Sequence, residues 1–347
     1  MRAVITGVAG FVGSHLVEAL LDLGWDVLGV DCFTPYYDVD RKRANLATAK
    51  CHPRFSFVAG DLRHVPIEPL IEGADAVFHQ AGQPGVRLSW GGGFGEYVGN
   101  NVLATQRLLE AACSVQCPRL VYASSSSVYG NAEHYPTSEL DLPRPHSPYG
   151  VTKLAAEHLC NLYADNWGLA TVALRYFTVY GPRQRPDMAM ARLVEAAVNG
   201  GGFPVYGDGN QVRDFTFVGD VVRANIAAAT EDVPPGAVMN ISGGASVTLN
   251  EVISVVEELS AASVELERLP GQPGDAQRTG GTAERAHKLL GWQPEVSLRE
   301  GLARHVEWQR VASEQRECLD ISEDSNAGPP RETGRERVDG HDINYVR

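Results

Sequence analysis

The stretch ITGVAGFVGSHL (residues 5–16) decides the fold of this chain. It runs from apolar residues into glycines spaced Gly-x-x-Gly-x-x-Gly, and then into apolar residues at helical spacing. Glycine allows a tight turn and lets the backbone approach a pyrophosphate, whose negative charge the N-terminus of a helix favours. We therefore expect a strand, a glycine turn and a helix that bind a dinucleotide, with a plain strand–helix turn as the alternative.

Strand and helix patterns alternate from the start of the chain to Gly181. Strands are expected over 3–6, 26–31, 54–61, 74–79, 118–125 and 169–176, and helices over 11–24, 97–112 and 148–167. The last helix has Ser147 as its N-cap and Pro148 at its first position. This alternation predicts a Rossmann-type α/β fold, a doubly wound parallel sheet covered by helices, with ligands at the carboxyl ends of the strands.

Beyond Gly181 prolines and glycines interrupt shorter elements. Helices are expected near 188–199, 219–230, 249–259, 283–290 and 298–310, and strands near 203–207, 212–218, 237–242 and 263–269. We expect a dinucleotide-binding domain over 1–180 and a smaller C-terminal α/β substrate domain over 181–312, with the strand over 237–242 returning to the first sheet. The polar, aperiodic residues 313–347 predict a disordered tail, or an interaction tail.

The composition excludes several classes of function. The net charge of −13 argues against nucleic acid and anionic membranes as partners. The first strand begins at Arg2, which leaves no room for a signal peptide, and no apolar run is long enough to span a bilayer. The six cysteines include no Cys-x-x-Cys pair and no zinc-like spacing. We therefore expect a cytoplasmic protein with reduced cysteines and no metal.

The second strand ends in a carboxylate that indicates which dinucleotide binds. Asp31 can accept hydrogen bonds from both ribose hydroxyls and would repel a 2′-phosphate, so NAD is favoured over NADP. Asp61-Leu62, after the third strand, could meet the adenine amine or form a plain turn. The residues expected to hold NAD are Gly7, Gly10, Phe11, Val12, Gly13, Asp31, Asp61, Leu62, Asn101, Tyr149 and Lys153.

The helix SPYGVTKLAAEHL (147–159) carries the expected chemistry. Tyr149 and Lys153 are four residues apart, so they lie on one helix face. The lysine and a positive nicotinamide both favour phenolate, so we expect the pKa of Tyr149 to fall from its usual value of about 10. Such a base can take a hydroxyl proton while hydride leaves the carbon. Tyr and Lys at this spacing are otherwise surface residues, but ASSSSVYG (123–130) adds hydroxyls at the strand end.

These motifs together resemble the extended short-chain dehydrogenases that act on nucleotide sugars, over about residues 1–311. The resemblance implies that Ser125 binds the reacting hydroxyl beside Tyr149 and Lys153. The segments GDGNQVRDFTFVGDVV and LPGQPGDAQRT also resemble the family, and they imply that Arg213 and Arg278 contact the UDP phosphates. Either arginine could instead be a surface residue. The resemblance further implies a homodimer built from the helices around 97–112 and 148–167.

The motif RYFTVYGPRQRPDMA (175–189) is similar to the UDP-glucuronate 4-epimerases, including those of moenomycin-type antibiotic biosynthesis, and YYDVDRKRANL (36–46) resembles the same group. Branches that dehydrate or decarboxylate usually carry an acid in the stretch that matches residues 125–127, where this chain has only serines. The decarboxylases and galactose-type epimerases typically have asparagine where Thr178 stands. We therefore expect C4 epimerisation of UDP-glucuronate through a 4-keto sugar.

A 4-keto glucuronate is a β-keto acid, so an epimerase must pin its carboxylate to prevent decarboxylation. The residues expected to bind the substrate are Arg87, Ser125, Ser126, Ser127, Thr178, Arg185, Tyr206, Arg213 and Arg278. Arg87 or Arg185 would hold the carboxylate, although each could be part of a structural ion pair. The glycines of SWGGGFGEY (89–97) and the sequence GTAERA (281–286) depart from the family pattern, which weakens the assignments of Arg87 and Arg278.

Three rival functions remain at this stage. The first is a UDP-glucose 4-epimerase, or an epimerase that accepts both sugars. The second is a UDP-glucuronate decarboxylase, which the serine run disfavours. The third is a protein that binds NAD or a nucleotide sugar without catalysis, which the intact Ser125, Tyr149 and Lys153 disfavour.

Overall fold

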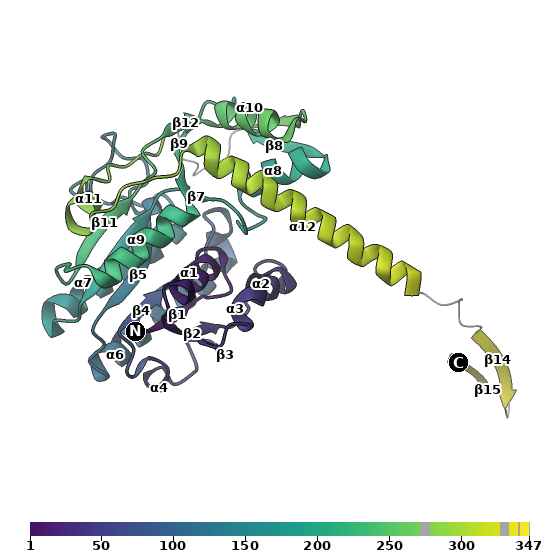
Figure 1. The fold of residues 1–347 in the computed structure, drawn as a ribbon, viewed down its shortest axis with the longest axis horizontal. Coiled ribbons are helices and arrows are strands. Elements are labelled where there is room, and N and C mark those ends of the chain that lie inside the picture. The colour runs from purple at the N-terminus through teal and green to yellow at the C-terminus, as the bar shows by residue number, and fades with distance from the viewer. Residues whose placement is uncertain (271–277, 327–332, 339–340, 347) are drawn as a thin grey trace.

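A parallel sheet forms the centre of the molecule (Figure 1). The computed structural model describes residues 1–270, 278–326, 333–338 and 341–346. The sheet has seven strands in the order β11-β6-β5-β4-β1-β2-β3. Its strands are β1 (Arg2–Thr6), β2 (Asp26–Asp31), β3 (Phe55–Ala59), β4 (Ala76–His79), β5 (Leu120–Ser125), β6 (Thr171–Tyr176) and β11 (Ala237–Ile241). The chain order reverses between β1 and β4, which is the point where such sheets bind dinucleotides.

Helices cover both faces of this sheet. On one face α1 (Phe11–Asp22) packs against α9 (Val218–Thr230), and on the other α6 (Ala104–Ser114) packs against α7 (Pro148–Trp167). Adjacent residues of β1 alternate between the two layers: Val4 belongs to the core under α6 and α7, and Ile5 to the core under α1. Each such fully buried side chain contributes about 1.5–3 kcal/mol. The Rossmann-type fold expected from the sequence is confirmed.

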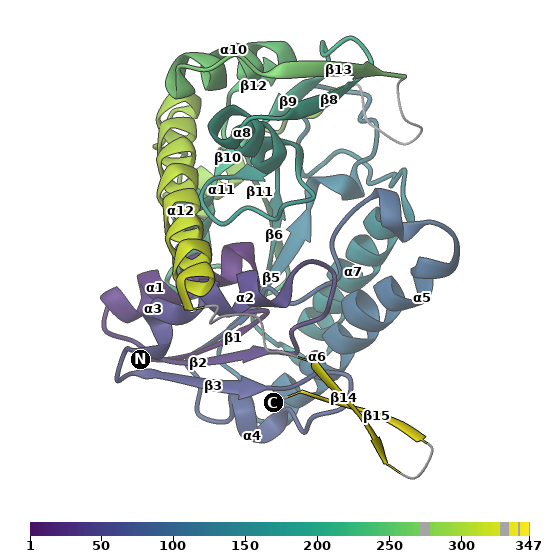
Figure 2. The same ribbon diagram turned by 90° about the vertical axis from the view of Figure 1, so that its right-hand side faces the viewer.

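A second part of the chain gathers at the other end of the molecule from β1–β3 (Figure 2). It contains three small sheets, in which β7 pairs with β10, β9 with β12 and β8 with β13. Its elements are β7 (Val179–Tyr180), α8 (Ala189–Asn199), β8 (Gly202–Tyr206), β9 (Val212–Asp214), β10 (Thr216–Phe217), β12 (Ser246–Thr248), α10 (Leu249–Ser260), β13 (Glu265–Leu269), α11 (Glu284–Leu290) and α12 (Leu298–Asn326). Between these elements β11 returns to the main sheet and pairs with β6.

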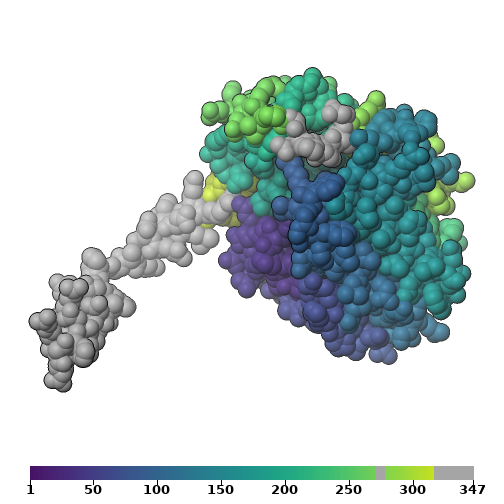
Figure 3. Space-filling view, turned by 180° about the vertical axis from the view of Figure 1, so that it is seen from behind, coloured from purple at the N-terminus to yellow at the C-terminus, as the bar shows by residue number. Residues whose placement is uncertain are grey.

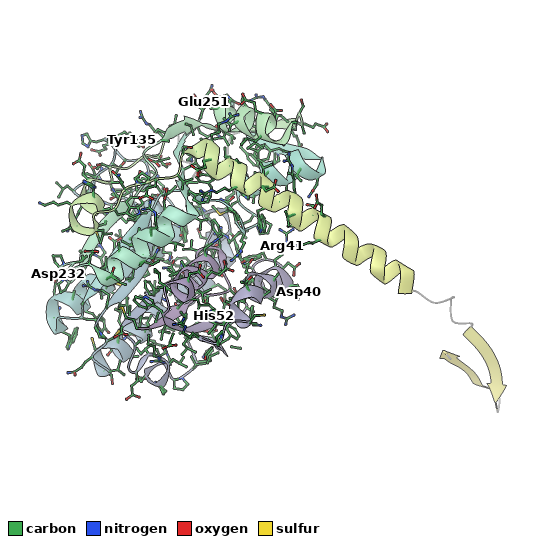
Figure 4. All side chains as sticks on the ribbon, viewed as in Figure 1. Asp40, Arg41, His52, Tyr135, Asp232 and Glu251 are labelled. Atoms are coloured by element: carbon green, nitrogen blue, oxygen red, sulfur yellow. The ribbon has the colours of Figure 1, made fainter. Side chains whose placement is uncertain are left out.

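Short helices lie between the longer elements of the N-terminal part. They are α2 (Val39–Asn45), α3 (Ala47–Lys50), α4 (Glu68–Ile71), η1 (Arg87–Ser89), η2 (Gly91–Gly93), α5 (Phe94–Tyr97), η3 (Val98–Leu103) and η4 (Ser126–Val128). Arg41 of α2 reaches Glu195 of α8 at 3.8 Å, so an ion pair links the two parts (Figure 4). Because both side chains are well exposed, this pair contributes about 0–1 kcal/mol.

The structure differs from the expected elements in three places. The helix expected over 97–112 begins earlier, at α5, and contains the π-helical turn η3 before α6. The strand expected over 212–218 is divided into β9 and β10, because each half pairs with a different partner strand. In the tail, where disorder or an interaction role is expected from residue 313, α12 continues to Asn326, and β14 (Thr333–Val338) pairs with β15 (His341–Val346); the role of the tail stays a prediction. Helix-forming Glu, Gln, Arg and Leu residues explain the longer α12.

Candidate active site

One large cavity, of about 760 Å³, lies where the carboxyl ends of the strands meet the second part of the chain. Its walls include Asp31 and Ser125 from strand ends, and Phe203 and Tyr206 from β8. Figure 3 shows the face on which residues of the N-terminal part, in purple and blue, meet the teal and green residues that follow. Every residue expected to bind cofactor or substrate lines this cavity except Asn101 and Arg278.

The glycine turn leaves no room for side chains. Gly7 has a φ of +70°, and a Cβ there would lie 2.6 Å from the backbone nitrogen of Ala81. A Cβ on Gly13 would lie 2.3 Å from the carbonyl oxygen of Gly7. Gly10 is the N-cap of α1 and provides no side-chain cap, so the first N–H groups of the helix can bind an anion instead. This close-packed turn fits the pyrophosphate of a dinucleotide.

Asp31 is fixed at the end of β2, opposite the glycine turn. Its carboxylate accepts hydrogen bonds from the backbone N–H groups of Ala9, at 3.0 Å, and Phe33, at 2.8 Å. Lys42, which the sequence analysis did not single out, lines the same end of the cavity and donates to the carbonyl oxygen of Thr34 at 2.7 Å. Burial lowers the pKa of Lys42, and the nearby Asp31 opposes that change.

The other expected cofactor residues have different surroundings. Asp61 lines the cavity, and its carboxylate pairs with the guanidinium of Arg63, whose hydrogen bonds lower the pKa of Asp61. Asn101 lies in η3 and does not reach the cavity wall. Its amide instead bonds both backbone groups of Gln83, at 2.6 and 3.0 Å, and the Thr152 hydroxyl at 3.0 Å. The structure therefore places Asn101 behind the loop that follows β4, where it positions that loop.

Tyr149, Lys153 and Ser125 meet at the end of β5. Ser147 caps α7 by accepting from the N–H of Gly150 at 3.1 Å, and this fixes where Tyr149 enters the cavity. The Ser125 hydroxyl hydrogen-bonds Tyr149, and Lys153 Nζ donates to the carbonyl oxygen of Ala123 at 2.9 Å. Burial lowers the pKa of Lys153 to about 8.

The expected fall in the pKa of Tyr149 is not found in the protein alone. Burial raises the pKa of Tyr149, while the hydrogen bond from Ser125 and the charge of Arg185 oppose this change without cancelling it. The expectation relied on a full charge on Lys153 and on the positive ring of a nicotinamide. In the protein alone, the burial of Tyr149 outweighs the groups that favour phenolate, and the nicotinamide belongs to the cofactor.

A buried network supports the serine turn from behind. Glu157, one turn after Lys153 on α7, accepts from the Ser124 hydroxyl at 2.7 Å and from Arg175 of β6 at 2.5 and 3.0 Å. Arg175 also donates to the Tyr129 hydroxyl at 2.6 Å. The side chains of Glu157 and Arg175 are only 2% and 5% exposed. The network thus ties the ends of β5 and β6 to the helix that carries Tyr149.

The residues expected to hold a sugar carboxylate line the same cavity as Tyr149. They include Thr178, the serine turn 125–127 and Arg185, whose charge acts on Tyr149. Arg185 also pairs with Asp187, to which its Nε and Nη2 each donate at 3.0 Å. Burial alone would lower the pKa of Arg185, but Asp187 more than offsets this and raises it. The sequence analysis gave Asp187 no role.

The other arginines expected to bind the substrate, Arg213 and Arg278 at the diphosphate and Arg87 at the carboxylate, have different surroundings. Arg213 of β9 lines the cavity, and its guanidinium donates to the carbonyl oxygen of Val212 at 3.0 Å. Arg87 lies 4.4 Å from the ring centre of Tyr206, and both line the cavity. Arg278 instead stacks on Tyr135, at 5.0 Å from the ring centre, outside the cavity wall; Tyr135 is labelled in Figure 4. Most of LPGQPGDAQRT, residues 271–277, lies outside the described residues.

Other candidates have structural surroundings. His79 is fully buried between the hydroxyls of Thr6, at 2.7 Å, and Thr105, at 2.9 Å, and burial lowers its pKa to about 3. It is therefore a satisfied core residue. Within the described part of the chain no cluster of His, Cys, Asp or Glu could hold a metal ion, and no helix there is long and apolar enough to cross a membrane.

Comparison with known proteins agrees with this geometry. The model of the NAD dependent epimerase/dehydratase family matches residues 3–242. The chain belongs to this family. The family depends on NAD, and the glycine turn and Asp31 fit that cofactor, so NAD is the cofactor of this chain. The resemblance found in the sequence is thereby confirmed.

Individual relatives match most of this chain and nearly all of their own length. An uncharacterized UDP-glucose epimerase, YtcB, of Bacillus subtilis is 39% identical over 88% of this chain and 97% of its own length. A UDP-glucuronate 4-epimerase of Thermodesulfobacterium geofontis is 36% identical over 88% of this chain and 95% of its own. The crystal structure of UDP-glucuronic acid 4-epimerase from Bacillus cereus in complex with UDP-glucuronic acid and NAD is 40% identical, with a TM-score of 0.87 over 90% of this chain and 100% of that one.

Proposed function

We propose that this chain catalyses the NAD-dependent C4 epimerisation of UDP-glucuronate to UDP-galacturonate. It is an enzyme of the UDP-sugar 4-epimerase kind, and UDP-glucuronate is the substrate that its site favours. The observation that carries the choice is that Arg185, Thr178 and the serine turn line the same cavity as Tyr149. One cavity thus offers a base, together with a cation and hydroxyls for a carboxylate. The biosynthetic pathway in which the chain acts stays a prediction.

Each residue around Tyr149 has a separate role in the proposed mechanism. Tyr149 removes the proton of the C4 hydroxyl, and Ser125, which hydrogen-bonds Tyr149, also binds that hydroxyl. Arg185 favours the phenolate because its charge acts on Tyr149. When bound, NAD supplies the chemistry of hydride acceptance and return at C4. After the 4-keto sugar has rotated in the site, Tyr149 returns the proton to the oxygen. No net oxidation occurs.

Retention of the carboxylate separates this function from decarboxylation. The turn 125–127 contains only hydroxyl side chains, which cannot readily supply the proton transfers of an elimination. Charge-assisted hydrogen bonds to a carboxylate contribute roughly 1.5–3 kcal/mol each. Because about 1.4 kcal/mol is a tenfold effect, two such bonds from Arg185 and Thr178 would bias the carboxylate strongly toward one orientation.

The rival with a specific observation in its favour is UDP-glucose 4-epimerisation. The B. subtilis relative is named as a UDP-glucose epimerase. In this chain Asp187 also balances the charge of Arg185, which reduces the cost of binding a neutral sugar there. The two activities are compatible in one site. The substrate preference is therefore a quantity to be measured.

We expect the enzyme to be a homodimer. Apolar side chains are exposed on the two helical segments expected to form the interface. They are Phe94 (39%), Val98 (39%) and Leu103 (48%) around η3, and Val151 and Leu162 (both 49%) on α7. Sedimentation equilibrium would test this, since a monomer at micromolar concentration would contradict it.

The experiment that tests the function is proton NMR of the sugar during incubation with UDP-glucuronate and NAD. Appearance of UDP-galacturonate without carbon dioxide is the expected result. UDP-xylose would assign the chain to the decarboxylases. No change with UDP-glucuronate, together with conversion of UDP-glucose, would assign it to the neutral-sugar epimerases, and bound ligands without any turnover would indicate a binding protein.

A further inference from the structure

The arginine expected to hold the sugar's carboxylate already holds a carboxylate of the protein. Arg185 and Asp187 form a two-point pair, with both hydrogen bonds at 3.0 Å. Tyr36 contacts the same pair: its ring centre lies 5.8 Å from the guanidinium carbon, and its hydroxyl donates to Asp187 Oδ2 at 3.3 Å. All three side chains line the cavity that contains Tyr149.

The geometry of the pair allows a second acceptor. A guanidinium carries five N–H donors in a planar fork, and Asp187 accepts from one on Nε and one on Nη2. The remaining edge, formed by Nη1 and Nη2, matches the shape of another carboxylate. A carboxylate bound there would face Asp187 across one guanidinium. Two like charges so close repel each other, and the repulsion is stronger in a partly buried cavity than in water.

We propose that Asp187 is a specificity-determining residue that acts through Arg185. By neutralising Arg185, it weakens the preference of the site for a sugar that carries a carboxylate and lets a sugar with a neutral hydroxymethyl group bind in the same place. The inference deepens the proposed function and rests on it, because it requires the substrate carboxylate to lie on Arg185.

Asp61, which lines the same cavity, forms an ion pair with Arg63 that serves for comparison. Asp61 and Arg63 have the same spacing in the chain, form a two-point pair with contacts of 2.7 to 3.1 Å, and lie at the β3 side of the cavity, far along the sheet from Tyr149. Asp61→Asn and Asp187→Asn therefore each remove one negative charge, from opposite ends of the cavity. Only the second removes it from beside Arg185.

The test measures kcat/KM for UDP-glucuronate and for UDP-glucose in the wild-type enzyme and its variants. If UDP-glucose is not turned over, its inhibition constant as a competitor replaces its kcat/KM. We expect Asp187→Asn to raise the preference for UDP-glucuronate about tenfold, mainly through a lower KM, since one pairwise repulsion is removed. Because Asp61 is expected at the cofactor, Asp61→Asn should change both kcat/KM values by the same factor and leave their ratio unchanged. Asp187→Glu, which keeps the charge, should stay near the wild type.

A double-mutant cycle shows whether Asp187 acts through Arg185. In an Arg185→Gln background, Asp187→Asn should no longer change the ratio. An equal change for both sugars, or the same change of ratio in the Arg185→Gln background, would overturn the inference while leaving the epimerase function intact. If the wild-type enzyme converts neither sugar, the proposed function and this inference fall together. Thermal melting identifies any variant that fails to fold. If Asp187→Asn does, Asp187→Ser, which also removes the charge, carries the comparison.

Discussion

The two ends of the cavity are built in different ways. At the cofactor end the shape comes from backbone: Gly7 and Gly13 have no space for a Cβ, and Asp31 is fixed by two backbone N–H groups. At the sugar end the charge balance comes from side chains of separate segments, such as Tyr36 and Asp187 around Arg185. The first end therefore tolerates almost no substitution, whereas single substitutions at the second can retune the substrate without disturbing the fold.

The largest effect is expected where the two ends meet. Tyr149→Phe removes the base for either sugar, so kcat should fall roughly 10²–10⁴-fold with both UDP-glucuronate and UDP-glucose. The ring and its edge contact with Tyr97, at 6.3 Å between ring centres, are kept, so the fold should be unchanged. The amount of NAD that copurifies or can be bound should stay the same. Undiminished turnover by this variant would show that another group is the base.

The next largest effect is expected on stability, from the buried ion pair of Glu157 and Arg175 behind the serine turn. Glu157→Gln leaves the Arg175 charge without its partner in the core, which should lower the free energy of unfolding by roughly 3–5 kcal/mol in urea titrations. Glu300→Gln is the control, because its pair with Arg304 is about half exposed and should cost about 0.3–0.5 kcal/mol. Equal losses in the two variants would contradict a structural role for the network.

Much of the fold could be predicted because its signals are local. Ser147, Pro148 and Gly168 mark the ends of α7, and the helix runs from Pro148 to Trp167 as expected. The break between β9 and β10 could not be predicted in this way. It arises because β9 pairs with β12 and β10 with β7, and such pairing between distant segments leaves no local pattern in the sequence.

The same distinction applies to the site. The glycine turn and the Tyr149–Lys153 spacing are local patterns, and the structure brings both to one cavity. Asp187 stood inside a quoted motif, but its contact with Tyr36 joins residues 151 positions apart. Asn101 shows a further contact of this kind: its amide bonds the backbone of the β4 loop, and its expected role at the cofactor stays a prediction. The roles of all these residues in binding and catalysis stay predictions.

A smaller effect tests the rigidity of the cofactor end. Gly13→Ala places a Cβ 2.3 Å from the Gly7 carbonyl, so the turn must shift, at a cost of about 1–3 kcal/mol in stability. NAD affinity should fall, and kcat/KM should fall by the same factor for both sugars. Gly92→Ala is the control, since a Cβ there would have no neighbour within 4 Å and the change should stay within about 0.5 kcal/mol. A change in sugar preference would show that the two ends are coupled.

The smallest effect tests the charge balance of the sugar end, and its sign is the informative part. Burial, followed by the charge of Asp187, raises the pKa of Tyr36 to about 12, so its hydroxyl keeps its proton and donates to Asp187 throughout the working pH range. That donation draws part of the Asp187 charge away from Arg185. Tyr36→Phe should therefore neutralise Arg185 more fully and lower the preference for UDP-glucuronate, the opposite of Asp187→Asn.

The hydroxyl withdraws only part of the Asp187 charge, so the preference should change by less than the tenfold expected for Asp187→Asn, about 2- to 5-fold or roughly 0.4–1 kcal/mol. Tyr37→Phe is the matched control, because the Tyr37 hydroxyl lines the same cavity but is buried with no hydrogen-bond partner among the described residues. Its loss should leave the ratio of the two kcat/KM values unchanged. If Tyr36→Phe instead raises the preference for UDP-glucuronate, the hydroxyl supports the pairing of Asp187 with Arg185. The sugar end would then be a rigid scaffold like the cofactor end, and the contrast between the two ends would not hold.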